Sequence, residues 1–270
     1  MSREELLAEV GRLLSLLKGG GLARFGVIPW AAPVVAFGSP IESQVATLGL
    51  NPSNLEFVDG KGLQLIETKK RFESLQSLHL SKWEQVNIEH VELILESCEE
   101  YFFRNPYDQW FKRLEKILVE TGASYYGRIG RGACHLDLVP FATAEKWSAL
   151  SRIQKAELIE LGAPSLARTL SASNVKVLVL NGATVVREFG RLLSGASLQA
   201  QPQPNWTLQG GRVQGLSYTA RVSAVGGIRL QHEILVLGFN HNIQSSFGVT
   251  TQVVSNIAAW IGQQAEGVLE

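Results

Sequence analysis

The chain has 270 residues, 45% of them hydrophobic and 19% charged, and its 25 basic and 25 acidic residues give no net charge at pH 7. This composition predicts a globular protein with a sizeable core, and the balanced charge excludes a protein that coats nucleic acid through its overall field. The two cysteines, Cys98 and Cys134, are too few for a disulfide framework, a four-cysteine zinc site or an iron–sulfur cluster.

Membrane and export signals are not apparent in the sequence. No apolar run approaches the ~20 residues that a membrane span needs, and residues 1–18 form a charged, amphipathic helix pattern without a signal-peptide core. We therefore expect a cytoplasmic protein with reduced cysteines and no membrane partner. We also expect a monomer. No pattern of metal ligands is present, so we expect neither a metal nor another cofactor.

Hydrophobic periodicity alternates between helix and strand patterns along most of the chain. Helices are expected at residues 4–17, 86–103, 105–118, 153–170, 183–193 and 253–261. Strands are expected at residues 34–38, 45–50, 133–143, 175–182 and 233–238, with a small hairpin at residues 198–218. The strand–turn–helix repeat predicts a three-layer α/β/α fold with a central, mostly parallel sheet. Residues 1–270 then form a single domain, on which the N-terminal helix and linker of residues 1–33 pack.

A short polar stretch follows the buried strand expected at residues 45–50. It reads Gly49-Leu50-Asn51-Pro52-Ser53 and places Asn51 at the carboxyl end of that strand. Ligands bind at this edge of open α/β sheets, so an amide held between a glycine and a proline is a candidate site residue. The alternative is an ordinary strand-terminating turn, for which Asn-Pro-Ser is well suited.

An acidic residue, Asp137, lies within the apolar pattern of residues 133–143. Burying an isolated carboxylate is costly, so Asp137 should have hydrogen-bond donors aimed at it or line a cavity. Pro140 favours a strand that ends just beyond Asp137, which puts this carboxyl at the same ligand edge. The alternative is a surface-facing position on an edge strand, because His135 and Asp137 alternate with leucines.

His241 stands just past the last expected strand and is surrounded by Asn, Gln and Ser residues. This position is the same sheet edge as that of Asn51 and Asp137, although a single histidine often has a structural role. The Asn-Gly pair after the strand at residues 175–182 is interpreted only as a turn, because one glycine does not make a dinucleotide-binding fingerprint.

Two glycine-containing loops could surround a pocket at this edge. The first spans residues 54–65, and the second spans residues 125–132, where Arg128 and Arg131 accompany two tyrosines. Such loops often carry function, and the second could hold a phosphate or a base. A solvated surface loop is the alternative for both.

The order of these parts resembles the uracil-DNA glycosylase superfamily over residues 35–262. That family carries a Gly-x-Asn/Asp-Pro motif after an early strand, matched by residues 49–52, and a histidine motif after the last strand, matched loosely by residues 241–245. In its single-strand-selective members a base-reading Asn precedes a Pro by three positions, and Asp137 and Pro140 stand in that place.

The resemblance implies a DNA glycosylase, an enzyme that flips a nucleotide out of the helix and hydrolyses the bond between base and sugar. Asn51 would orient the water, His241 would donate to the base as negative charge develops there, and Asp137 would read the base. Phe57 is the candidate stacking floor, although Leu65 occupies the usual aromatic position. Further substrate contacts are implied for Leu50, Pro52, Ser53, Phe57, Leu65, Pro140 and Phe141. DNA contacts are implied for Arg128, Arg131, Asn242, Gln244, Ser245 and Ser246.

One departure from the family pattern bears on the substrate. An ionised Asp137 offers only acceptors, where the family's Asn offers uracil both a donor and an acceptor. It would repel O4 of uracil and accept a hydrogen bond from the N4 amine of a cytosine-type base. A mismatched buried partner costs about 1–3 kcal/mol, so this one residue could invert the base preference. A protonated Asp137 could instead give a proton to N3 of the base.

A glycosylase that removed plain cytosine would destroy the genome of its host, so a modified cytosine is the coherent substrate. The chain therefore resembles the bacterial anti-phage branch of the superfamily, which excises glucosylated hydroxymethylcytosine from phage DNA. Three alternatives stay open: a uracil or thymine mismatch-repair glycosylase, a catalytically inactive nucleic-acid-binding relative, and an unrelated nucleotide-binding α/β protein. The last of these would lack a phosphate-cradling glycine motif.

Overall fold

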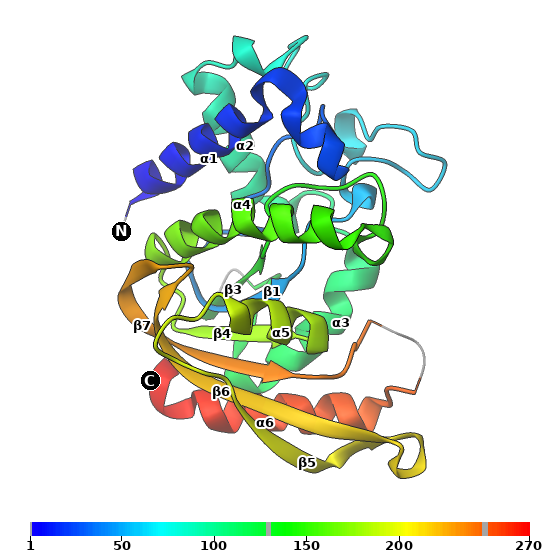
Figure 1. The fold of residues 1–270 in the computed structure, drawn as a ribbon, viewed down its shortest axis with the longest axis vertical. Helices are drawn as coiled ribbons and strands as arrows, with labels where there is room; N and C mark the ends of the chain where they lie inside the picture. Colours follow the sequence, from blue (N-terminus) through cyan, green and yellow to red (C-terminus); the bar gives the residue numbers. More distant parts are fainter. Residues whose placement is uncertain (1, 128–130, 245–247) are drawn as a thin grey trace.

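The computed structural model describes residues 2–127, 131–244 and 248–270 (Figure 1). Within these residues, seven strands form one sheet in the order β2-β3-β1-β4-β7-β6-β5. The strands are β1 (Ser43–Gly49), β2 (Ala123–Ser124), β3 (Arg131–Asp137), β4 (Val177–Asn181), β5 (Gln199–Leu208), β6 (Val213–Val225) and β7 (Ile228–Phe239). The α-helices are α1 (Arg3–Leu17), α2 (Ile88–Glu99), α3 (Asp108–Leu118), α4 (Arg152–Ser171), α5 (Ala183–Arg191) and α6 (Thr251–Leu269).

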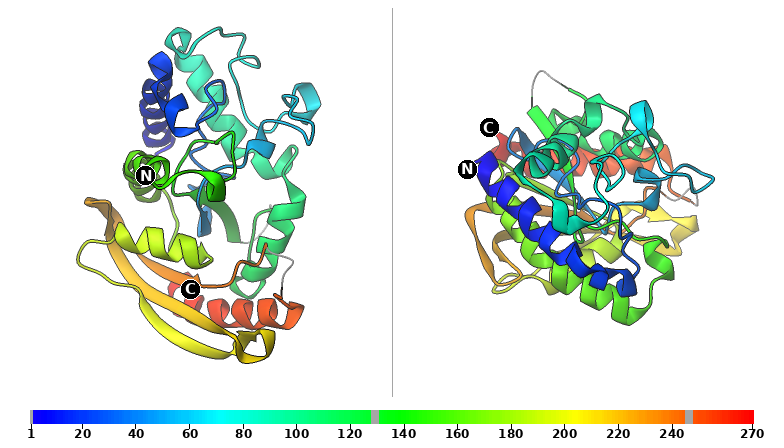
Figure 2. Two further views of the ribbon diagram at one scale, coloured as in Figure 1. Left: turned by 45° about the vertical axis from the view of Figure 1, so that its right-hand side comes forward. Right: turned by 90° about the horizontal axis from the view of Figure 1, so that it is seen from above.

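The predicted fold class, a three-layer α/β/α arrangement with a mostly parallel sheet, is confirmed. Each neighbouring pair from β2 to β7 is parallel, whereas β6 and β5 extend the sheet in antiparallel pairing. Helices α4 and α5 cover one face of the sheet, and α3 and α6 cover the other (Figure 2). No helix in the described part of the chain has both the length and the apolar character of a membrane span.

The central strands are built from short apolar runs that are buried on both faces. Residues 177–180 of β4 are fully inaccessible to solvent, as are Val45, Ala46 and Leu48 of β1. Branched aliphatic side chains suit such positions because helices cover both sides of a parallel sheet. Asn181 then ends β4, Asp137 ends β3 and Asn51 lies just beyond β1, so three polar residues meet at the carboxyl ends of the central strands.

A buried ion pair fixes the N-terminal helix to the rest of the protein. The Glu9 side chain on α1 is 1% exposed and accepts hydrogen bonds from Arg168 of α4 and from Arg12 of its own helix. Leaving such a carboxylate without its partners would cost several kcal/mol, so helix α1 is held in one position on α4.

Several expectations about secondary structure need correction. The strand expected at residues 133–143 ends at Asp137, and the last helix extends to Leu269, beyond the expected residue 261. Residues 34–38 do not form a strand, because Phe37 makes a single antiparallel bridge to His135 before Gly38 turns away with φ = 84°. The hairpin expected at residues 198–218 is larger than predicted, since β6 runs on to Val225 and joins β7 through the adjacent glycines 226 and 227. Both of these glycines have positive φ, as a tight hairpin turn requires.

An aromatic cluster fills the space between the sheet and α3. Phe37, Phe72, Tyr101 and Phe111 pack with ring centroids 4.9–5.4 Å apart, mostly edge to face. Such contacts add to the burial of large apolar surfaces and hold the rings in fixed orientations. The cluster forms a rigid wall behind the carboxyl ends of β1 and β3.

Candidate functional site

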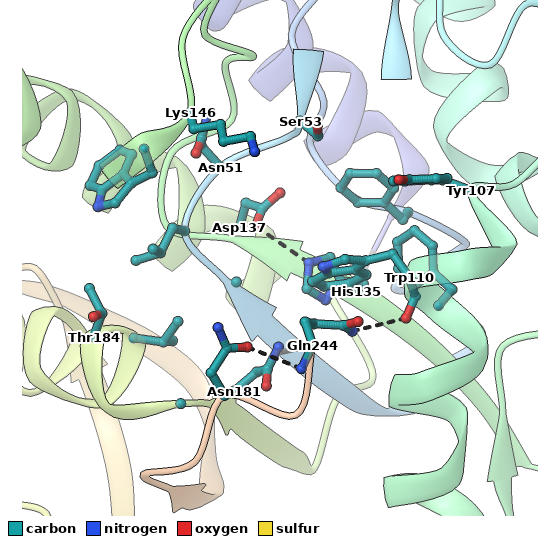
Figure 3. Close-up of a pocket in the computed structure, with 18 of the residues that line it drawn as sticks. Asn51, Ser53, Tyr107, Trp110, His135, Asp137, Lys146, Asn181, Thr184 and Gln244 are labelled. Atoms are coloured by element: carbon teal, nitrogen blue, oxygen red, sulfur yellow. Dashed lines mark hydrogen bonds and ion pairs between the residues drawn. The ribbon is translucent and has the colours of Figure 1, made fainter. Parts of the chain in front are cut away.

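A pocket of about 580 Å³ opens at the carboxyl ends of β1, β3 and β4 (Figure 3). This volume lies within the roughly 300–1,000 Å³ typical of small-molecule sites, and the position is the one at which open α/β sheets bind ligands. Its lining comes from strand ends, from the start of α5, from α3 and from the segment after β7. The lining includes Leu50, Asn51, Glu56, Trp110, His135, Asp137, Lys146, Asn181, Thr184, Asn242 and Gln244.

Asn51 is held with its amide nitrogen toward the protein. Its Nδ2 donates to Oγ1 of Thr143 and to the carbonyl of Pro52, both at 3.0 Å. The Thr143 hydroxyl donates in turn to the carbonyl of Glu145, so Oγ1 can only accept from Asn51. This fixes the orientation of the Asn51 amide and leaves Oδ1 as the atom that can bind a ligand or a water molecule in the pocket.

Asp137 places a carboxylate in the pocket that is almost completely shielded from solvent. The residue is 9% exposed, and its Oδ1 lies 3.4 Å from Nε2 of His135. Its Oδ2 is buried without a hydrogen-bond partner among the described residues. Because buried polar atoms in folded proteins are nearly always paired, Oδ2 is the atom whose partner a bound ligand would supply.

The absence of a side chain at Gly49 makes room for this carboxylate. Parallel pairing places Gly49 directly beside Asp137 and Thr47 beside His135. A Cβ atom at Gly49 would overlap Oδ1 of Asp137 and would lie 2.9 Å from Nε2 of His135. The glycine of the Gly-x-Asn-Pro stretch is therefore required by the acid on the neighbouring strand.

Sequence reasoning did not identify His135 as a site residue. Its ring is 2% exposed and lies among the rings of Phe37, Trp110 and Phe111, with centroids 4.9–5.5 Å away. Its Nδ1 forms a hydrogen bond of 2.6 Å with Oγ1 of Thr47. The alternation with leucines in the sequence indicates a strand face, and only the register with β1 reveals that this face leads to the pocket.

Glu56 is a second carboxyl that sequence reasoning did not identify. It ends the 3₁₀ turn Asn54–Glu56, lines the pocket and is 3% exposed. Burial raises the pKa of Glu56 to about 7, although the Arg71 guanidinium, 3.9 Å away, and a hydrogen bond from the Tyr101 hydroxyl at 2.8 Å lower it. The negative charge of Asp137 raises the Glu56 pKa further. The pocket thus holds one carboxyl that changes its charge near neutral pH.

Three amide side chains, those of Asn181, Asn242 and Gln244, line another part of the pocket. Asn181, interpreted from the sequence as part of a turn, lines the pocket, and its Oδ1 is buried without a described partner. Asn242 and Gln244, two expected DNA-binding residues, also line the pocket. The Gln244 amide donates to the carbonyl of Trp110 at 2.9 Å and ties this segment to α3 (Figure 3).

His241 does not enter the pocket, contrary to what the family resemblance implies. Its side chain is buried, and its Nε2 makes a 2.6 Å hydrogen bond with the carbonyl of Trp206 on β5. Of the three expected catalytic residues, Asn51 and Asp137 line the pocket.

The remaining expected substrate contacts fall into two groups. Leu50 and Ser53 line the pocket with Asn51. Five others do not line it: Pro52, Phe57, Pro140 and Phe141 are buried and Leu65 is half-buried. Phe57 packs against Trp30 and Phe72, so it belongs to the aromatic core and not to a stacking floor.

Arg131, an expected DNA-binding residue, does not line the pocket. Arg131 binds the carbonyls of Thr121 and Leu269, both at 2.6 Å, at the start of β3 and therefore at the opposite edge of the sheet. Arg128, Ser245 and Ser246 lie outside the described residues. Among the described residues, the basic side chain that lines the pocket is Lys146, which lies near Asn51 in Figure 3.

Comparison with known proteins adds no family assignment. The sequence matches no protein-family model, and it matches no curated protein.

Proposed function

We propose that this protein is a monofunctional DNA glycosylase that hydrolyses the N-glycosidic bond of a flipped-out, modified cytosine. The observation that carries the proposal is the pair formed by Asn51 and Asp137. An amide oxygen and a buried carboxylate oxygen, both without described partners, face one pocket at the carboxyl edge of a parallel sheet. The first can hold a water molecule, and the second can accept a hydrogen bond from a base.

The chemistry follows from the charges that develop as the bond breaks. The bond between C1′ and the base nitrogen breaks, and its electron pair passes to the base. The water oxygen then bonds to C1′, and one of its protons ends on the departing base. Asn51 Oδ1 suits the task of orienting this water, because an oxocarbenium-like sugar needs little activation of its nucleophile.

The lining supports a cytosine-type base over uracil. Asp137 Oδ2 can only accept when it is ionised, so it pairs with the N4 amine of cytosine and repels the O4 atom of uracil. Trp110 and Tyr107 supply aromatic surface along the wall formed by α3, against which a flipped base can stack. The pocket is larger than a pyrimidine ring requires, and this leaves space for a substituent such as a glucosylated hydroxymethyl group.

A strand-nicking assay tests the proposal. Duplexes and single strands carrying uracil, cytosine, hydroxymethylcytosine or glucosylated hydroxymethylcytosine are incubated with the protein and then treated with alkali, which cuts at abasic sites. We expect cleavage at a modified cytosine and its loss in Asn51→Ala. Asn54→Ala is the matched control, because Asn54 also bonds the segment after β3, through the carbonyl of Ala144, but does not line the pocket.

The other outcomes identify the alternatives. Cleavage at uracil alone would refute the cytosine preference and indicate a repair glycosylase. An absence of cleavage at every base, with DNA binding unchanged in Asn51→Ala, would refute the enzymatic proposal and indicate a nucleic-acid-binding protein.

A further inference from the structure

Asp137 is the last member of a chain of buried polar groups that begins at Tyr125, the residue after β2. The Tyr125 hydroxyl bonds Oγ1 of Thr47, and that oxygen bonds Nδ1 of His135 at 2.6 Å. On the far side of the ring, Nε2 of His135 lies 3.4 Å from Oδ1 of Asp137. Register explains the alignment, because Thr47 pairs with His135 and Gly49 pairs with Asp137 across β1 and β3.

We infer that His135 is a positioning residue: its Nε2–H points at Oδ1 of Asp137 and leaves Oδ2 free for the substrate, with the position of the ring proton set by Tyr125 and Thr47. This inference rests on the proposed function, since it assigns how the base-reading carboxylate is held. Asp137 itself is the residue that would touch the base.

Only one direction of donors satisfies the whole chain. Tyr125 is 2% exposed, and the described hydrogen-bond acceptor within reach of its hydroxyl is Thr47 Oγ1. The Tyr125 hydroxyl therefore donates its hydrogen to Thr47 Oγ1. Thr47 then has one proton left, which it donates to Nδ1 of His135. Nδ1 is therefore the bare nitrogen, and the ring proton is on Nε2, facing Asp137. The reverse direction would leave the Tyr125 hydrogen without an acceptor among the described residues.

The ring cannot readily leave this orientation. Phe37, Trp110 and Phe111 surround it with centroids 5.3, 4.9 and 5.5 Å away. A flip would exchange Nδ1 with Cδ2 and Nε2 with Cε1, so Thr47 Oγ1 and Asp137 Oδ1 would each face a ring carbon in place of a nitrogen. The 3.4 Å separation of Nε2 and Oδ1 is long for a hydrogen bond, and catalytic contacts of this kind shorten when a substrate closes the site.

Other titratable groups line the same pocket and could also orient the Asp137 carboxylate. Glu56 from the turn after β1, Tyr107 at the start of α3 and Lys146 after β3 are the further titratable groups lining the pocket in the described part of the chain. None of these is joined to Asp137 by a described hydrogen bond or ion pair. His135 is therefore the group that orients Asp137 directly.

Nitrogen NMR of the whole protein, labelled with ¹⁵N at its five histidines, measures the tautomer without reference to activity. The His135 signals are identified by their loss in His135→Gln. We expect a neutral ring protonated at Nε2 at pH 7, and a mixed or reversed tautomer in Thr47→Val, which removes the donor to Nδ1. Tyr126→Phe is the control, because the Tyr126 hydroxyl bonds Asp108 outside the chain. A wild-type ring protonated at Nδ1, or at both nitrogens, would overturn the inference.

Excision rates under single-turnover conditions test the consequence for chemistry. His135→Phe keeps an aromatic ring of similar size and removes Nε2, so we expect a roughly 10-fold or larger loss of rate with DNA affinity unchanged. His135→Gln restores an amide donor and should recover most of the rate. An unchanged rate in His135→Phe would overturn the inference. Should the wild-type protein excise no base, the proposed function fails, and the tautomer still decides how Asp137 is held.

Discussion

Replacing Glu56 by Gln tests whether the pocket contains a carboxyl that is neutral below pH 7. Burial raises the pKa of Glu56 from 4.5 to about 7, against the opposing effects of Arg71 and Tyr101. Gln cannot ionise, yet it keeps an oxygen that can accept from the Tyr101 hydroxyl. The variant therefore removes the titration while conserving the size of the side chain and one of its hydrogen bonds.

The sign and size of the effect follow from proton linkage. Between pH 4.5 and about 7 the folded protein holds a proton on Glu56 that the unfolded chain has released, so the free energy of unfolding falls as the pH rises through this range. A shift from 4.5 to about 7 corresponds to about 3 kcal/mol, since each pH unit is worth ~1.4 kcal/mol. The proton held on Glu56 therefore gives the folded protein about 3 kcal/mol of stability below pH 4.5 relative to its stability well above pH 7.

Urea unfolding at a series of pH values measures the difference between the variant and the wild-type protein, in which the contributions of all other groups cancel. We expect Glu56→Gln to gain about 3 kcal/mol relative to wild type between pH 4.5 and pH 8. In Tyr101→Phe the same transition should move to higher pH, because the hydrogen bond that lowers the Glu56 pKa is gone. A difference that is constant across this range would mean that Arg71 keeps Glu56 ionised throughout and would refute the reasoning.

Three further substitutions follow from the site. Gly49→Ala should lower the free energy of unfolding by about 1–3 kcal/mol in urea titrations and abolish excision, because the new Cβ overlaps Asp137, whereas Gly60→Ala has open space around it and should do neither. Asp137→Asn should shift excision from cytosine-type bases toward uracil by roughly 10- to 100-fold in rates measured on both substrates; unchanged rates on both would exclude a base-reading role. His241→Ala should lower the melting temperature, since the carbonyl of Trp206 loses its partner, but leave the excision rate of the folded protein intact; a large loss of rate would restore a catalytic role for His241.

The layers of the fold and two of the site residues could be predicted because they depend on local patterns. Apolar runs that end in a polar residue define β1 and β3, and parallel strands bring their carboxyl ends to one edge. Asn51 and Asp137 therefore meet in one pocket as expected. Which residues lie at the carboxyl ends of the strands depends only on strand direction, and the alternation of helices and strands already determines that direction.

The direction in which a side chain points depends on partners that are distant in sequence, and here the predictions were incomplete. His135 becomes a pocket residue through its register with Thr47, and Glu56 through a turn whose burial the loop sequence does not indicate. His241 follows its strand as predicted, but its ring turns toward the carbonyl of Trp206. That carbonyl belongs to β5, a strand that the sequence indicates only as part of a small hairpin.

The strand order also determines when the pocket can exist during synthesis. Asn51 follows β1 and emerges early. Strand β1 nevertheless lies between β3 and β4, and one wall of the pocket comes from residues beyond Phe239. Contacts between such distant segments close late, because a long intervening chain must be ordered first. A nascent or truncated chain that ends before β7 would lack part of the pocket. If the proposed function holds, excision activity would therefore appear only in chains that extend beyond β7 to the segment that lines the pocket.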